Sequence, residues 1–386
     1  ATANFGTDVV GNLIYVAGGT GAVTGDWYEI TARTNATTIT VDRSTGLTAG
    51  TGVTLKIGGA MLSLSIVLSK AVAGQTAYVK NGTYSISTNT SGVANGTLSS
   101  SVYVLVIGYS STRAFGNDGD TRPIFQTSGS TITTNRGGGP AYANLTFDGN
   151  SQTAATFSSA GAVFIGCVVK NFTSGSSGSG LAWGCEFTGN TANVWGGNTA
   201  FCVAYGNTAC PFSSGVAVSH FHTLSYSNTG ASTDGFLVQT AQSHFVNCTA
   251  ANNGRDGFRA SASAGCYAMN CHSEGNGGYG FNWTGSGTVI RCSTYNNTSG
   301  ATSGGANFAT ADLLTASAMA LVNVGAGNLA LNNTAGAGAT LRAASYAGYQ
   351  AAFPAGLTTG YLDIGAVQHA DPAVVRFPSP LDGGLV

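Results

Sequence analysis

The middle of the chain repeats one short pattern: Cys or Thr, then four residues, then Asn, then Thr or Gly. The pattern begins at Cys185, Cys202, Thr223, Cys248, Cys271 and Cys292, so successive copies start 17, 21, 25, 23 and 21 residues apart. Asn328 and Asn333 fit the same frame, and Cys167 fits it loosely. A copy every ~17–25 residues suits a coil whose turns hold three short strands each. The repeat therefore predicts an all-β fold, a right-handed, single-stranded parallel β-helix.

The residue types at the repeated positions follow from stacking. Parallel strands lie about 4.8 Å apart, so equivalent residues of successive turns form ladders. An inward-facing Cys is a small, nearly apolar filler for a narrow interior, and Thr223 in the same place favours packing over disulfides for the eight cysteines. The Asn that ends each copy is expected in a turn, in the left-handed conformation, with its side chain bonded to the Asn of the next turn.

A second ladder has the same period. Asp234-Gly-Phe236, Asp256-Gly-Phe258 and Tyr279-Gly-Phe281 follow one another at 22 and 23 residues, and Phe308 comes later. Gly permits a bend at this point, and the Phe side chains are expected to stack inside the coil. Two ladders with one period support the same fold.

Three segments are expected along the chain. Residues 1–59 contain short strand-like runs between turns, which predicts a small β module that either docks the coil to another molecule or covers its first turns. The β-helix occupies residues 60–370, and the run 61–73 predicts a short amphipathic helix that caps its first strands. Residues 371–386, with three prolines, are expected to form an extended tail.

The composition excludes several kinds of partner. Only 8% of the residues are charged and the net charge is −1, which offers no electrostatic basis for binding nucleic acid. No apolar run approaches the ~18 residues of a membrane-spanning helix, so membrane insertion is not expected. No cationic segment followed by an apolar stretch begins the chain, so no signal peptide is visible.

Candidates for catalysis are few, because the chain has 15 acidic residues. Asp234 and Asp256 stack one turn apart in the predicted ladder, with Arg255 beside them. Cleavage of a glycosidic bond needs two carboxylates, ~5 Å apart for retention or ~6.5–9.5 Å for inversion. Asp-Gly is also ordinary turn chemistry, and this is the favoured interpretation of both residues. Glu186 and Glu274 occur singly.

The sequence gives little support for a metal site or for a catalytic nucleophile. His220, His222, His244 and His272 fall at different places relative to the Asn ladder, so they are not expected to align as a metal site. No Ser-His-Asp arrangement, phosphate-binding loop or dinucleotide fingerprint is present in the sequence. We therefore expect no metal and no other cofactor.

Tyr205, Tyr226 and Tyr295 each lie three residues after the Cys or Thr of their repeat. If that residue points into the coil, an odd offset along the strand points outward. The three tyrosines would then form an outer stripe, which serves either as a contact between subunits or as a platform for a glycan.

Three runs of sequence carry a resemblance to known proteins. The run GQTAYVKNGTYSI (74–86) resembles the first turn of pectate-lyase-like parallel β-helix proteins, in which a short helix precedes it. The runs VIGYSSTRAFGNDGDTRPIF (106–125) and GYLDIGAVQ (360–368) resemble β-helix proteins of tailed phages and related bacterial surface proteins. The resemblance covers roughly residues 55–370 and implies the fold. Enzymes on this fold mostly cleave polysaccharides, with carboxylates or with Arg or Lys and Ca²⁺, and no compact Asp cluster for Ca²⁺ is present.

The function expected first is that of a structural protein of a bacteriophage virion, a rigid rod that decorates the capsid or forms a tail appendage. Absence of catalysis is favoured, because the acidic and basic residues that an enzyme needs are scarce. The alternatives are a polysaccharide lyase or glycoside hydrolase and a bacterial cell-surface adhesin. The expected partners are further copies of the chain, as a trimer, other virion proteins and host surface polysaccharide. The expected location is the virion surface, with secretion or the bacterial cell surface as alternatives.

Overall fold

The computed structural model describes residues 4–6, 9–10, 12–18, 23–45, 52–58, 74, 76–86, 104–110, 122–128, 131–133, 140–158, 160–175, 179–239, 242–261, 265–304, 308–311, 313–342, 344 and 363–367. The chain divides into two compact units, residues 1–66 and 67–386. The helix predicted at 61–73 and the tail predicted at 371–386 lie outside the described residues. The predicted boundaries at 59 and 370 stay a prediction.

The first unit is a small antiparallel sheet with its own core. Its strand order is β3-β2-β1-β4, with β1 at Leu13–Gly18, β2 at Val23–Asn35, β3 at Thr38–Val41 and β4 at Val53–Gly58. Buried and partly buried residues alternate along β1, as expected for a strand with one face on a core. That core contains Phe5, Val9, Ile14, Val16, Tyr28 and Ile30. A β module in this part of the chain is therefore confirmed.

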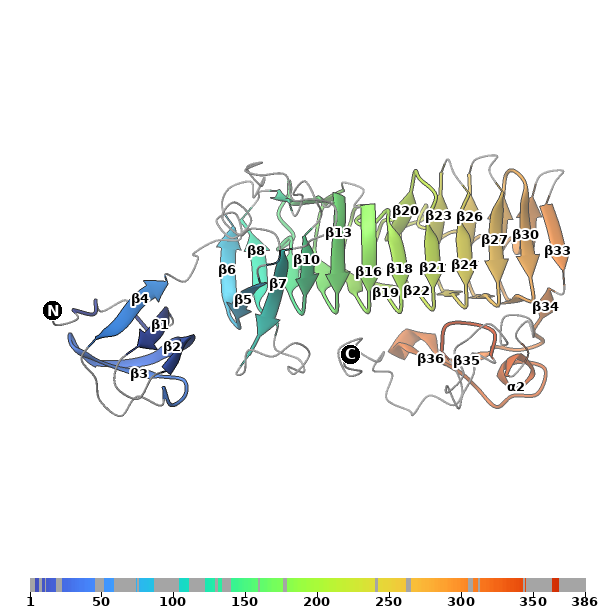
Figure 1. Ribbon diagram of the computed structural model, residues 1–386. Helices are drawn as coiled ribbons and strands as arrows, with labels where there is room; N and C mark the ends of the chain where they lie inside the picture. The colour runs from blue at the N-terminus through green and yellow to red at the C-terminus, as the bar shows by residue number, and fades with distance from the viewer. Residues whose placement is uncertain are drawn as a thin grey trace. The chain divides into compact units, whose positions relative to one another are not determined.

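The second unit is a parallel β-solenoid, in which strands of successive turns lie side by side along the coil (Figure 1). The first face is an 11-stranded sheet of β5 (Thr76–Lys80), β7 (Leu105–Tyr109), β10 (Ala141–Ala143), β13 (Ala160–Ile165), β16 (Ser179–Trp183), β18 (Asn198–Ala200), β21 (Ser219–Phe221), β24 (His244–Val246), β27 (Cys266–Met269), β30 (Gly287–Ile290) and β33 (Phe308–Ala311).

The second face is a sheet of the same size. It consists of β6 (Thr83–Ile86), β8 (Ile124–Thr127), β11 (Thr146–Asp148), β14 (Val168–Lys170), β17 (Glu186–Thr188), β19 (Val203–Tyr205), β22 (Leu224–Tyr226), β25 (Thr249–Ala251), β28 (His272–Glu274), β31 (Ser293–Tyr295) and β34 (Leu314–Thr315). The third face consists of β9 (Ile132–Thr133), β12 (Thr156–Ser158) and β15 (Ser174–Gly175), then β20 (Phe212–Ser214), β23 (Phe236–Val238), β26 (Phe258–Ala260), β29 (Tyr279–Trp283) and β32 (Gly300–Gly304). Every strand pair within these faces is parallel, which confirms the parallel β-helix.

The asparagines form the predicted ladder. The side-chain Nδ2 of each of Asn190, Asn207, Asn228, Asn253 and Asn276 donates to Oδ1 of the Asn one turn on, at 2.8–3.0 Å, and the ladder ends at Asn297. The same Oδ1 also accepts from the backbone N–H of the preceding Asn, at 2.9–3.4 Å. The six side chains are buried, so the bonds lie in a low-dielectric interior where each contributes more than it would in water.

The predicted left-handed conformation of these asparagines is wrong, because the residue before each one makes the bend. Gly189, Gly206, Ser227, Asn252, Gly275 and Asn296 have positive φ, and the ladder asparagines do not. A second left-handed residue precedes each Cys or Thr of the repeat, such as Asn247 (φ 51°) before Cys248. One left-handed residue at each corner is enough to turn the chain onto the next face, and the Asn after it points its amide into the corner.

The remaining ladders pack the interior. None of the eight cysteines is in a disulfide and all eight are buried, in agreement with the predicted packing role. Phe212, Phe236, Phe258 and Phe281 stack with centroids 4.9–5.3 Å apart and rings within 16° of parallel. The predicted continuation to Phe308 is wrong: this residue begins β33 on the first face, opposite Gly287, and Thr302 lies opposite Phe281. The 27 residues from Phe281 to Phe308 exceed one turn of this ladder, so the chain has already passed to another face.

A C-terminal segment, defined here as residues 316–342, 344 and 363–367, packs on the second face (Figure 1). It contains β35 (Leu321–Asn323), the 3-10 turn η1 (Val324–Ala326), β36 (Asn328–Leu331) and α2 (Gly338–Leu341). Since β36 pairs antiparallel with β35, the frame match at Asn328 and Asn333 is not a further turn of the solenoid, and that prediction is wrong. No helix among the described residues has the length and apolar character to cross a membrane.

Candidate functional site

The acidic residues proposed for catalysis hold neighbouring turns together at the corner before the third face. Arg255 donates from Nε and Nη2 to the two carboxylate oxygens of Asp234, at 2.7 and 2.5 Å. The backbone N–H of Asp256 donates to the same carboxylate at 3.2 Å. Asp256 in turn accepts from the backbone N–H of Tyr279 at 2.7 Å and from Asn282 Nδ2 at 2.8 Å.

These contacts leave Asp234 and Asp256 little freedom to act on a substrate. Both side chains are almost fully buried, at 0% and 2% exposure. A carboxylate that accepts a backbone N–H from the next turn satisfies a donor that the interior would otherwise leave unpaired, which is costly. The structure thus brings Asp234, Asp256 and Arg255 together as predicted, in an arrangement typical of turn stabilisation.

The tyrosine stripe is interrupted. Tyr205 and Tyr226 face each other on adjacent strands of the second face, with centroids 5.4 Å apart and rings within 16° of parallel. Ala251 and Glu274 occupy the next two places of the same column, and Tyr295 follows them. Tyr226 packs against the C-terminal segment, so part of the predicted outer stripe is an internal contact of the chain.

Strands β11, β14, β17 and β19 of the second face carry polar groups on their outward columns. Tyr205 donates its hydroxyl to Glu186 Oε1 at 2.6 Å, and Lys170 Nζ lies 3.5 Å from Asp148 Oδ2. Partial burial, and then the bond to Glu186, raise the pKa of Tyr205 to about 12, so its hydroxyl keeps its proton near neutral pH. We call Asp148, Lys170, Glu186 and Tyr205 the polar strip.

The spacing of the two acids in the polar strip limits what they can do. Asp148 and Glu186 lie two strands apart and two residues apart along the strand. Strand geometry puts roughly 12 Å between their backbones. Asp148 also accepts from the backbone N–H of Asn150 at 2.7 Å and from Asn171 Nδ2 at 3.0 Å. This pair does not match the spacing of two carboxylates that flank a glycosidic bond.

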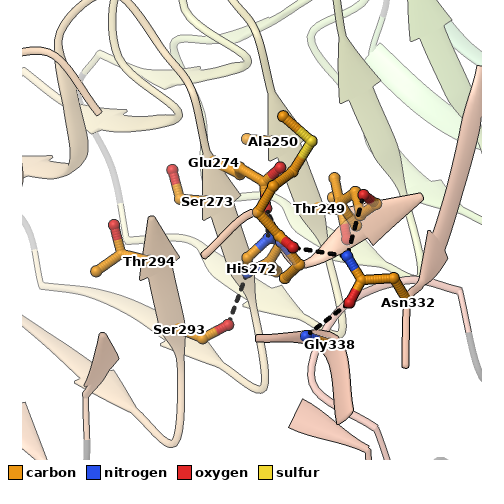
Figure 2. Close-up of polar contacts among 12 residues, drawn as sticks. Thr249, Ala250, His272, Ser273, Glu274, Ser293, Thr294, Asn332 and Gly338 are labelled. Carbon is orange, nitrogen blue, oxygen red and sulfur yellow. Dashed lines mark hydrogen bonds and ion pairs between the residues drawn. The ribbon is translucent and has the colours of Figure 1, made fainter. Parts of the chain in front are cut away.

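A second polar group lies under the C-terminal segment (Figure 2). His272 Nδ1 is 2.7 Å from Ser293 Oγ, and His272 Nε2 is 3.1 Å from Glu274 Oε2. Glu274 Oε2 also accepts from the backbone N–H of Ala320 at 2.8 Å, whereas its Oε1 is buried without a hydrogen-bond partner. Figure 2 shows Asn332 of the same segment, whose Oδ1 accepts from Gly338 N at 3.2 Å.

The sequence prediction missed Glu186, Glu274 and Ser293 as members of these groups, although the repeat contains the signal. Glu186 and Ser293 stand one residue after a repeat Cys, and Glu274 stands three after one. Both offsets point outward on the second face. The ladder frame therefore predicts their direction, but it does not show that the C-terminal segment covers His272, Glu274 and Ser293.

The four histidines lie in different columns, which fits the sequence prediction that they do not align. His220 points into the coil from the first face, His222 lies at a corner, His244 faces outward and His272 lies on the second face. Burial lowers the pKa of His220 to about 3 and that of His222 to about 4. Within the described ranges, no group of three or more His, Cys, Asp or Glu side chains is arranged to hold a metal ion.

Comparison with solved structures concerns the fold. The pectate lyase Pel9A aligns with a TM-score of 0.50 and 14% identity, over 79% of this chain and 90% of its own. This chain has a pectate-lyase-like parallel β-solenoid fold. The A-module of the mannuronan C-5 epimerase AlgE6 from Azotobacter vinelandii aligns with a TM-score of 0.33 and 15% identity, over 66% of this chain and 95% of its own. No protein-family model and no curated protein sequence matches the chain.

The similarity to Pel9A confirms the pectate-lyase-like part of the sequence resemblance. At 14% identity it carries no information about activity. The similarity to Pel9A does not bear on the virion part of the resemblance, which stays a prediction.

Proposed function

We propose that this chain is a structural protein of a bacteriophage virion, a rigid β-solenoid without a catalytic role. The observation that carries the proposal is the use of the acidic residues. Asp234 and Asp256 are buried and bound to backbone amides of the next turn, and Glu274 accepts the backbone N–H of Ala320. These three of the 15 acidic residues therefore hold the fold together, and their carboxylates are not directed at a substrate.

The placement on a virion is supported by the resemblance of residues 106–125 and 360–368 to β-helix proteins of tailed phages. In the second of these runs, Ile364 is fully buried against the second face, and Gly365 N donates to Asn270 O at 2.7 Å. The run therefore has a mechanical role in fastening the C-terminal segment to the solenoid. Such reinforcement suits a rod that is carried on the outside of a particle.

Two measurements test the proposal. Mass spectrometry of purified particles, from a phage whose genome encodes the chain, is expected to detect it at a fixed copy number relative to the major capsid protein. Purified protein incubated with host capsule or lipopolysaccharide is expected to release no oligosaccharide. Absence from the particles contradicts the virion role, and release of oligosaccharide contradicts the absence of catalysis.

The Tyr205–Glu186 pair favours a second candidate, a polysaccharide-degrading enzyme. Glu186 is a partly buried carboxylate at an outward position of the second face, and the Tyr205 hydroxyl donates to it at 2.6 Å. If oligosaccharide is released, this candidate predicts that Glu186→Gln lowers the rate at least about 100-fold, as expected for loss of a general acid or base. Glu274→Gln, which changes a covered carboxylate, serves as the matched control.

A further inference from the structure

The first face is unusual because its strands carry almost no charge. From β7 to β33, its strands contain no Asp, Glu, Lys or Arg, and Lys80 in β5 is the exception at the N-terminal end. The second face, built from the same turns, has Asp148, Lys170, Glu186 and Glu274 at outward positions. The two faces have the same number of strands, so the difference is specific to the first face and not a result of its size.

The outward positions of the first face are also apolar along one column. Trp183, Ala200, Phe221, Val246, Met269 and Ile290 occupy equivalent places on successive strands. Phe221 is 37% exposed, and Tyr267 in the neighbouring column is 45% exposed. Several large exposed apolar side chains on one sheet face indicate an interaction surface more often than a single exposed apolar side chain does.

On the second face, outward apolar residues are covered by another part of the chain. Leu224 and Ala251 point outward there, yet they are 3% and 0% exposed, because the C-terminal segment packs on them. Among the described residues, Phe221 and Tyr267 have no such cover and remain exposed. The first face therefore presents exposed aromatic side chains, Phe221 and Tyr267, beside apolar side chains of the same face that are already buried, with Ala200 and Val246 each 8% exposed.

We propose that the first face is the contact surface for a second copy of this chain, packed sheet against sheet. A charge-free face suits a copy of itself, because no like charges meet and no charge is left unpaired on burial. A two-fold contact is self-complementary, since each copy offers the same patch. The proposal goes beyond the virion role and does not depend on where the chain is carried.

The dimensions of the face are sufficient for a stable contact. Eleven strands at about 4.8 Å spacing extend about 48 Å along the coil, and strands of three to six residues give the face an average width of roughly 13 Å. Each copy would then bury roughly 600 Å² and the pair roughly 1,200 Å², which exceeds the ~1,000 Å² of a specific interface. Two sheets packed in this way usually cross at about 30°.

A second copy fits this face better than a glycan does. In the apolar column, Val246, Met269 and Ile290 offer no polar group to a sugar hydroxyl, and a buried hydroxyl without a partner costs ~1–3 kcal/mol. The polar side chains of this face, such as Ser219, His244 and Thr288, lie in the neighbouring outward column. Aliphatic side chains instead match aliphatic side chains of another sheet across the contact. The face-to-face geometry implies a dimer, which differs from the trimer expected from the sequence.

The test is the mass of the full chain in solution, measured by light scattering across a dilution series at micromolar concentrations. The wild-type chain is expected at twice its 38.5 kDa mass. Phe221→Asp and Tyr267→Asp are each expected to weaken the association at least about 100-fold, because each buries an unpaired charge. Val322→Asp is the matched control: Val322 is 48% exposed on β35 of the C-terminal segment, and its substitution is expected to leave the dimer intact.

Circular dichroism confirms that each variant retains its β structure, and Phe221→Ser replaces Phe221→Asp if that variant does not fold. A monomeric wild-type chain overturns the proposal, and so does a trimer. A dimer that survives both first-face substitutions overturns it as well. A monomer that a neutral polysaccharide column retains, and releases on Phe221→Asp, assigns the face to a glycan instead. These outcomes are independent of the virion role, which mass spectrometry of purified particles tests.

Discussion

At the residue scale, the side chain of each ladder asparagine satisfies at least three polar groups that the turns would otherwise leave unpaired. Asn253, for example, accepts from the backbone and side chain of Asn228 and donates to Asn276 Oδ1 and to Ser225 O. Buried networks of this kind stabilise only when every member is satisfied. The neutral amides of the ladder thus pair the buried polar groups of the turns, which in many proteins are paired by water or by charged side chains.

Replacement of one ladder asparagine is therefore expected to be costly. Asn253→Ala should lower the free energy of unfolding by roughly 2–4 kcal/mol, because it leaves buried groups of two neighbouring turns unpaired. The shift of the urea midpoint, followed by circular dichroism, measures this cost. Asn333→Ala is the control: Asn333 fits the same sequence frame but is exposed in the C-terminal segment, and its loss should cost under about 1 kcal/mol. Equal costs for the two variants would refute the structural ladder.

Buried histidines predict a pH dependence of stability. His220 stacks on Phe245 with centroids 5.4 Å apart, and burial lowers its pKa from 6.5 to about 3. The unfolded chain therefore binds a proton that the folded chain excludes. Stability from this site is fully present above pH 6.5 and is lost as the pH falls toward 3, by roughly 1.4 kcal/mol per pH unit.

His220→Phe should remove this contribution, because Phe fits the aromatic stack around Phe236 and Phe245 and does not titrate. Urea unfolding at pH 7 and at pH 4.5 is expected to show a smaller acid loss for the variant than for the wild-type chain. His244→Phe alters an exposed histidine of the same face and should keep the wild-type pH dependence. If His220→Phe keeps it as well, another group is responsible for the acid loss.

At the element scale, the C-terminal segment is fastened to the solenoid by contacts far apart in the sequence. Ala320 N donates to Glu274, Ala366 N donates to Thr249 Oγ1 at 2.9 Å, and Arg291 Nε donates to Ala344 O at 2.7 Å. Its apolar residues complete a cluster with Leu224 and Ala251 of the second face. The segment therefore hides part of one face that the turns alone would leave bare.

Loss of the Glu274 contact should loosen the segment. Glu274→Ala leaves the Ala320 N–H without its acceptor and removes the partner of His272 Nε2. A local cost of ~1–3 kcal/mol corresponds to about 5–150-fold more frequent opening. Cleavage between residues 316 and 344 under limited proteolysis, followed by mass spectrometry, is expected to accelerate by that factor. Glu186→Ala, which removes an outward carboxylate bonded to Tyr205, should not change the cleavage rate, and acceleration by both variants would contradict the fastening role.

At the scale of the whole molecule, the chain contains two units with separate cores. Ile30 belongs to the core of the small antiparallel sheet, and Phe258 belongs to the aromatic stack of the solenoid. Each of the two units, residues 1–66 and 67–386, is compact by itself. Separate cores allow the two units to unfold independently.

Scanning calorimetry should therefore show two transitions. Ile30→Ala is expected to lower only the transition of the first unit, and Phe258→Ala only that of the solenoid, with a loss of roughly 3–4 kcal/mol in each case. Each variant is the control for the other, because both residues have 0% exposure. A single transition that both variants shift would mean that the units unfold together.

The sequence alone determined the solenoid, its asparagine ladder, its buried cysteines and its phenylalanine stack. These features depend on contacts between adjacent turns, so one residue type recurs at a period that can be read along the chain. The same reasoning placed Tyr205 and Tyr226 on one column and brought Asp234 next to Arg255. It failed at Phe308 and Asn333, where the period continues by coincidence after the chain has left the corresponding face.

Only the tertiary structure decided which outward residues are covered and what the acidic residues do. The contact between His222 and Ala366 joins residues 144 positions apart, and no period marks such a pair in advance. Glu274 and Glu186 stand at outward positions of the same face, yet one lies under the C-terminal segment and the other beside Tyr205. Repetition makes neighbouring turns predictable from the sequence, whereas the packing of a segment that does not repeat depends on the shape of the surface that the turns have already built.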